Sequence, residues 1–140
     1  MPEIFSAPRA SQQAATLRGP HAQAFEEFLT ELQHGGCTAM GYRLTGNDPV
    51  DQLCVKHLRG SIRVVVAFVP EDAAWVLLVG PHDARDPATD IYAELWQLLG
   101  VERPAGERTK PPCCGPHETA PAIETELMWE IIEAAGRRRR

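Results

Sequence analysis

Residues 60–92, GSIRVVVAFVPEDAAWVLLVGPHDARDPATDIY, are the most informative part of the sequence about the fold. Residues 61–69 and 74–79 are apolar runs, and the turn-forming residues 70–72 separate them, which is typical of an antiparallel hairpin. Strand alternation puts Arg63 on the same face as residues 65, 67 and 69. A charged loop then carries His82 and Arg85 toward Tyr92. The stretch therefore predicts two core strands that deliver polar groups to one place.

Helical and strand patterns flank this hairpin. In residues 21–36, Phe25, Phe28, Leu29 and Leu32 form one apolar stripe, which predicts a helix. Residues 88–100 carry a similar stripe and end at a glycine, residues 6–17 are compatible with a helix, and residues 3–5 and 52–58 are strand-like. Residues 37–51 are rich in turn-forming types and are predicted as a loop. The order of elements predicts an α+β fold.

The C-terminal part has a different character. Residues 101–120 hold four of the twelve prolines and show no apolar periodicity, so we predict a linker or extended arm. Residues 121–136 begin with a proline and place Ile123, Leu127 and Ile131 four apart, as in an amphipathic helix. This helix could pack on the domain, on a partner or on a second copy, which would make a homo-oligomer. We therefore divide the chain into a domain at 1–100, an arm at 101–120 and a helix with a basic tail at 121–140.

The composition is that of a globular protein with an acidic balance. The chain has 140 residues, 44% of them hydrophobic, and a formal net charge of −5. Residues 1–100 carry seven Lys/Arg against twelve Asp/Glu, which disfavours a generally basic nucleic-acid-binding surface. No apolar run is long enough to span a membrane, and residues 1–20 lack the pattern of a signal peptide. We expect a cytoplasmic protein without membrane contact.

The four cysteines are sparse and irregularly spaced, so reduced thiols are expected. Cys113, Cys114 and His117 suggest a metal site, but adjacent cysteines lack the gap that lets one loop wrap a zinc ion. We therefore expect no metal and no cofactor.

The order helix, strand, hairpin, His/Arg loop and Tyr-bearing helix resembles the RelE/ParE superfamily of bacterial toxins, most closely its RelE and HigB branches. The segments that carry the resemblance are AFEEFLTELQHGG, VKHLRGSIRVVVAF, AAWVLLVG and HDARDPATDIY, within roughly residues 1–100. The resemblance implies a small curved antiparallel sheet with two N-terminal helices packed on it and a helix after the last core strand, here extended by an extra C-terminal helix.

The resemblance also implies a function. Toxins of this kind belong to type II toxin-antitoxin systems and inhibit translation by cleaving messenger RNA on the ribosome without a metal. The implied partners are a cognate antitoxin, the ribosome and mRNA. The family's Lys-x-Leu segment and following arginine are matched by Lys56, Leu58 and Arg63. Its late basic residue is matched by His82 or Arg85, and its C-terminal tyrosine by Tyr92.

These residue types suit RNA cleavage, which needs a base, cations beside the phosphorus and an acid for the leaving oxygen. His57 or Lys56 could be the base, and His82 or Tyr92 the acid. Arg63 and Arg85 could stabilise charge, because a guanidinium matches phosphate oxygens.

Each assignment competes with a structural interpretation. Arg63 could form a structural ion pair, the residues of the HDAR loop could be solvated, and Tyr92 could pack in the core. Lys56 and His57 are consecutive, so only one can face a given side of the sheet. Two other functions remain open: non-catalytic gyrase inhibition, as in ParE, and an inactive interaction module with the same fold.

Overall fold

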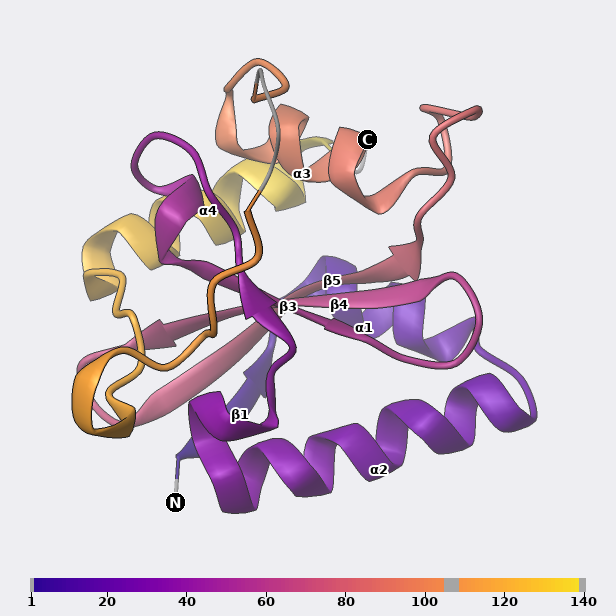
Figure 1. The fold of residues 1–140 in the computed structure, drawn as a ribbon. Helices are drawn as coiled ribbons and strands as arrows, with labels where there is room; N and C mark the ends of the chain where they lie inside the picture. The colour runs from indigo at the N-terminus through magenta and orange to yellow at the C-terminus, as the bar shows by residue number, and fades with distance from the viewer. Residues whose placement is uncertain (1, 105–108, 139–140) are drawn as a thin grey trace.

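The computed structural model describes residues 2–104 and 109–138, with side chains described as far as residue 134. It has the predicted α+β architecture, built on one open five-stranded sheet with helices on both faces (Figure 1). The strands are β1 (Glu3–Ser6), β2 (Tyr42–Arg43), β3 (Leu53–His57), β4 (Ile62–Val69) and β5 (Ala73–Pro81). The α-helices are α1 (Pro8–Ala15), α2 (Pro20–Gly35), α3 (Ile91–Leu99) and α4 (Thr125–Arg138), and 3-10 turns occupy Gly36–Ala39, Val50–Gln52 and Pro116–Glu118.

The strand order is β1-β5-β4-β3-β2, and the sheet is mixed. Strands β2 to β5 pair antiparallel, which confirms the predicted hairpin. Strand β1 instead lies parallel to β5, with Phe5 opposite Trp75. The difference from a wholly antiparallel sheet arises because the chain passes through both N-terminal helices before the sheet resumes, and no tight turn forces β1 to run antiparallel.

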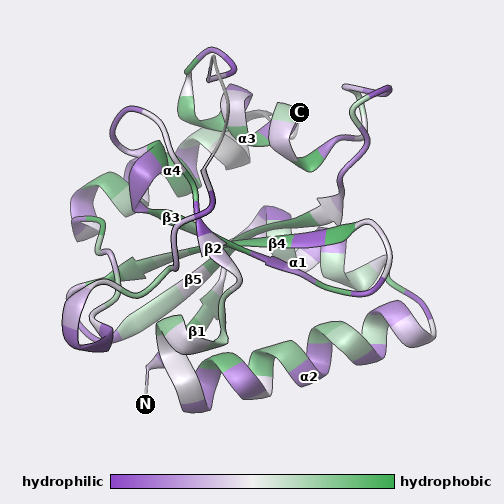
Figure 2. Ribbon diagram, in the orientation of Figure 1, coloured by the Kyte–Doolittle hydropathy of each residue, from purple (hydrophilic) through white to green (hydrophobic). Residues whose placement is uncertain are grey.

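Two apolar layers cover the two faces of the sheet. Helix α2 buries Phe25, Phe28 and Leu32 against one face, as its stripe predicts. Helices α3 and α4 cover the other face, where Leu95 and Met128 are buried. Figure 2 shows the alternation of hydrophobic and hydrophilic residues along α2, and Ala10 of α1 is buried in the same apolar layer. Burial of these stripes positions the helices, since isolated helices of this length are marginal in water.

Strand β5 contains an irregularity that matters for the site. Val65 lies opposite Leu78 but Val66 lies opposite Val76, so β5 has one extra residue. Leu77 and Leu78 consequently both belong to the core beneath α3 and α4. A bulge shifts every later residue of the strand to the opposite face. It therefore brings the residue after the strand, His82, to the same side as Arg63.

Residues 37–51, predicted as a loop, contain β2 and two 3-10 turns. Strand β2 has only two residues, too few for a period-two pattern to be recognised. Its backbone also pairs with a distant segment, since Arg43 N–H donates to the Pro111 carbonyl at 2.8 Å.

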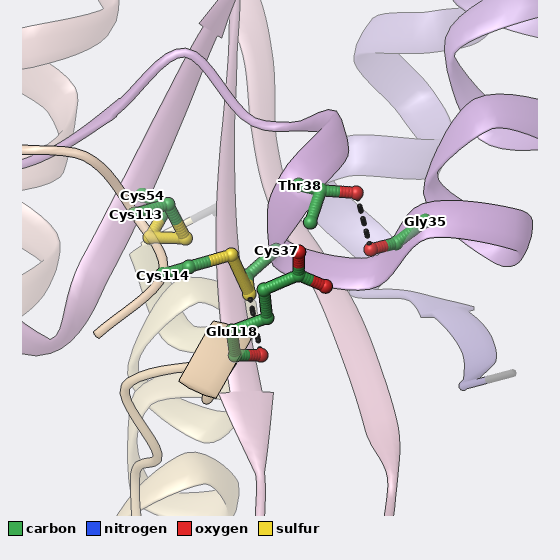
Figure 3. The surroundings of a disulfide bond; sticks show 7 residues. All are labelled: Gly35, Cys37, Thr38, Cys54, Cys113, Cys114 and Glu118. Atoms are coloured by element: carbon green, nitrogen blue, oxygen red, sulfur yellow. Dashed lines mark hydrogen bonds between the residues drawn. A yellow bond between two sulfur atoms is a disulfide. The ribbon is translucent and has the colours of Figure 1, made fainter. Parts of the chain in front are cut away.

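The prediction of reduced thiols is wrong: Cys37 bonds to Cys114, and Cys54 bonds to Cys113 (Figure 3). Four sparse and irregularly spaced cysteines did not indicate a disulfide framework, but Cys113 and Cys114 each reach a different segment. The bonds close separations of 77 and 59 residues, so each would stabilise the fold by roughly 4 kcal/mol in the chain-entropy view.

After the two disulfides, a backbone hydrogen bond also joins the C-terminal segment to the sheet. The residues before α4 form a bridge, in which Ile123 N–H donates to the Phe68 carbonyl at 2.7 Å. Ile123, Met128 and Ile131 are buried in the same core as α3. Among the residues that the structure describes, no helix combines the length and apolarity needed to cross a bilayer.

Candidate active site

A cavity of about 200 Å³ lies at the edge of the sheet where β3 ends, β4 begins and β5 ends. We call it the cleft. The backbone register explains its position, because His57 lies opposite Arg63 on β4, and Arg63 lies opposite Gly80, two residues before His82. The cleft is lined by Tyr42, Leu44, Thr45, His57, Arg63, His82, Tyr92, Thr109 and Lys110.

A chain of hydrogen bonds joins three of these side chains. The Tyr42 hydroxyl lies 2.9 Å from the Tyr92 hydroxyl and 3.3 Å from His57 Nε2. Tyr92 is buried with 5% exposure, whereas His57 is exposed at the cleft mouth. Because hydroxyl and imidazole groups both donate and accept, protons can pass along this chain.

His57 is surrounded by positive groups. Burial lowers the pKa of its imidazole, and the charges of Arg63, Lys110, His82 and Lys56 lower it further. The neutral imidazole therefore predominates at neutral pH, and it is the form that accepts a proton.

Asp90 holds His82 in place. One oxygen, Oδ1, accepts from His82 Nδ1 and from the Asp83 amide, both at 2.8 Å, and Oδ2 accepts from the Ala93 amide at 3.0 Å. Burial raises the pKa of the Asp90 carboxyl, but the hydrogen bond from His82 and those from the two amides outweigh burial, and the pKa lies below its usual range. The carboxylate thus caps α3 and holds the proton on His82 Nδ1, which leaves Nε2 for exchange with a ligand.

Two cations complete the cleft. Arg63 donates through Nη1 to the carbonyls of Gly60 at 3.1 Å and Ile62 at 3.3 Å, and its Nε is buried without a partner among the described groups. Lys110 Nζ lies 5.2 Å from the centre of the Tyr42 ring. Lys110 is near because the segment around it lies beside β2, where Arg43 N–H donates to the Pro111 carbonyl, and the disulfides of Cys113 and Cys114 hold the segment there (Figure 1).

A second cavity, of about 500 Å³, adjoins the cleft. His82 and Tyr92 line both cavities, and Trp96 and Arg103 extend the second one along α3. The His82 ring stands edge-on to Tyr92, with 4.9 Å between ring centres, so these two side chains form the wall between the cavities.

The structure brings together four of the six predicted site residues: His57, Arg63, His82 and Tyr92. Lys56 does not line the cleft, because it alternates with His57 along β3. Arg85 lies exposed in the loop, where its amide donates to Asp83 Oδ1 at 3.0 Å, and it lines neither of the two cavities.

Sequence reasoning missed Tyr42, Asp90 and Lys110. Asp90 had a recognisable signal, since an aspartate directly before a helical stripe is a common N-cap. Tyr42 and Lys110 lay in segments predicted as a loop and an arm, and no local pattern links them to the hairpin. Of the three residues considered as metal ligands, Cys113, Cys114 and His117, the two cysteines are both in disulfides.

The cleft offers two imidazoles, one from the end of β3 and one just after β5, with a tyrosine pair and two cations, a set suited to a phosphodiester. No protein family model matches this chain, and no curated protein is significantly similar to it in sequence.

Proposed function

We propose that this chain is the toxin component of a bacterial type II toxin-antitoxin system of the RelE/HigB kind, and that it cleaves messenger RNA on the ribosome. The observation that carries the proposal is the cleft, in which His57 and His82 lie with Arg63 and Lys110 around one cavity. The resemblance of residues 1–100 supports the same reading.

The chemistry would proceed without a cofactor. Neutral His57 accepts the proton of the 2′-hydroxyl, directly or through Tyr42, and the 2′-oxygen attacks phosphorus. Arg63 and Lys110 stabilise the extra negative charge that develops on the phosphoryl oxygens. His82 in its imidazolium form, oriented by Asp90 at Nδ1, donates its Nε2 proton to the departing 5′-oxygen and becomes neutral, while His57 keeps the proton of the 2′-hydroxyl. The products are a 2′,3′-cyclic phosphate and a 5′-hydroxyl, so atoms and charge balance.

The cleft is positive although the chain as a whole is acidic. The formal charge is −5 overall, but the cleft itself is lined by two full cations and two imidazoles. A locally positive cavity in an acidic protein binds a phosphate without attracting RNA generally. Ribosome-dependent cleavage fits this pattern, because the ribosome would supply the positioning of the message.

The test is inducible expression in a bacterium that lacks the antitoxin and has an oxidising cytoplasm, so that both disulfides can form. We expect growth arrest, cut translated messages with 5′-hydroxyl ends, and loss of both effects in His57→Ala and His82→Ala. His34→Ala is the matched control, since His34 lies exposed on α2, where its Nδ1 is 2.8 Å from the Thr30 carbonyl, and does not line the cleft. Intact messages with a DNA-damage response would favour a ParE-like gyrase inhibitor, and unaffected growth would favour an inactive interaction module.

A further inference from the structure

Phe5 and Trp129 are the two exposed large hydrophobic side chains of the described residues, at 40% and 53% exposure. They are not scattered, because both contact Trp75. Phe5 stacks on Trp75 with 5.0 Å between ring centres, and Trp129 meets it edge-on at 5.4 Å. We call these three residues the aromatic surface. A contiguous exposed patch of this kind marks an interaction site more often than single exposed residues do.

The aromatic surface is separate from the cleft. Phe5 lies on β1, the edge strand of the sheet, and Trp75 lies near the start of β5, whereas His82 follows the end of β5. Seven residues of extended chain span about 20 Å. The aromatic surface therefore takes no part in the proposed cleavage.

Carboxylates surround the aromatic surface. Glu126 lies three residues from Trp129, shares its side of α4 and is exposed. Glu3 is two residues from Phe5 on the same side of β1 and is also exposed. Glu71 marks the other border, where its carboxylate accepts from the Thr125 hydroxyl at 2.7 Å.

We propose that the aromatic surface is the docking site for a basic amphipathic segment of a partner protein. Apolar side chains of the segment would pack on Trp129 and Phe5, and its lysines or arginines would pair with the surrounding glutamates. Exposed tryptophans are typical binding hot spots, and a nearby cation gains further attraction from the indole ring.

Charge distinguishes a basic segment from nucleic acid, a membrane or a second copy of the chain as the partner of the aromatic surface. Nucleic acid and anionic membranes would meet the carboxylates of Glu3, Glu71 and Glu126, which repel them. The arginines of residues 137–140 begin eight residues beyond Trp129, about 12 Å farther along α4. A symmetric contact with a second copy of the chain would place the same carboxylates against one another. A cationic peptide is the partner whose charge complements the border of the surface.

The test measures binding of a fluorescently labelled probe peptide, LKKLLKLLKKLLKL, by anisotropy with the full chain. We expect saturable binding that weakens when sodium chloride rises from 50 to 500 mM. Trp129→Ala should weaken it by about 30-fold, the size of a typical hot-spot loss. Glu3→Gln/Glu126→Gln should weaken it more than Glu27→Gln/Glu31→Gln, the matched charge control on the exposed side of α2.

Several results would overturn the proposal. Equal binding of a probe with glutamate in place of every lysine would exclude charge recognition, and so would equal losses in the two double glutamine variants. Unchanged binding by Trp129→Ala would exclude the aromatic surface. Sedimentation showing a dimer that Trp129→Ala dissociates would assign the surface to self-association, and Trp129-dependent binding to anionic vesicles would assign it to membranes.

Discussion

The two ends of β5 carry opposite chemistry. Beyond its last residue, His82 joins Arg63 and Lys110 around a hollow that is polar and positive. Near its first residues, Trp75 joins Phe5 and Trp129 in an exposed aromatic surface bordered by glutamates. One strand thus connects a concave cationic site with an aromatic site of the opposite charge. The formal net charge of −5 therefore describes neither of these two surfaces.

The largest expected effect concerns the cleft alone. Arg63→Ala should lower the rate of RNA cleavage by about 10²–10³-fold, because a positioned donor that stabilises transition-state charge is lost. The rate is measured on ribosome-bound message. Arg59→Ala is the control, as Arg59 is exposed at the β3–β4 turn and does not line the cleft. Similar rates for the two variants would remove Arg63 from the mechanism. Binding of the basic probe at the other end should not change.

The second-largest effect concerns the disulfides, whose loss should affect the cleft more than the aromatic surface. Cys113→Ser/Cys114→Ser should lower the free energy of unfolding by roughly 2–5 kcal/mol per bond, measured in denaturant. Dithiothreitol should destabilise the unchanged chain in the same way and leave the double variant unaffected. Because the disulfides hold the segment of Lys110, cleavage should fall while probe binding at Trp129 persists. Equal stability with and without reductant would show that the bonds do not form in solution.

A smaller effect concerns the protonation of His57. Its pKa lies below 6.5 in the folded chain, so the stability linked to its neutral form is present above that pH and lost as pH falls. Lys110→Met should raise the pKa of His57, and the acidic limb of the cleavage profile should move up with it. The imidazole can be titrated by NMR. Lys56→Met is the comparison and should shift the pKa less, since Lys56 contributes less to lowering it. Equal shifts would contradict the arrangement of cations around His57.

The smallest effect is expected at the aromatic end. Trp129→Ala should change the free energy of unfolding by no more than about 0.5–1 kcal/mol, because the side chain is 53% exposed. Cleavage of RNA should be unchanged. Thermal unfolding and the cleavage assay measure the two quantities. A large loss of cleavage would show that the two ends of β5 are coupled.

Much of the architecture could be predicted from local patterns. The stripe of Phe25, Phe28 and Leu32 reports burial on one side of α2, and the continuous apolar run of β4 reports burial on both faces of the sheet. The predicted site residues His57, Arg63 and His82 lie at the ends of these strands, where the antiparallel order brings them together. That part of the site could be predicted because strands that are neighbours in the sheet are also close in the sequence.

The rest depended on contacts between distant segments. The bulge at Leu77 determines which face of the sheet His82 reaches. The sequence does not reveal it, because an apolar strand with one extra residue is still a continuous apolar run. The pairings of Cys37 with Cys114 and Cys54 with Cys113 follow from the return of the C-terminal segment across the sheet.

The sequence by itself therefore determined the helices, the hairpin and most of the chemical groups available, because these follow from local periodicity and residue type. Only the tertiary structure decided that Tyr42 bonds to both His57 and Tyr92, that Lys110 joins the cleft, and that Phe5 and Trp129 meet on Trp75. The physical reason is that these contacts depend on strand register and chain return, which the packing of the whole chain settles.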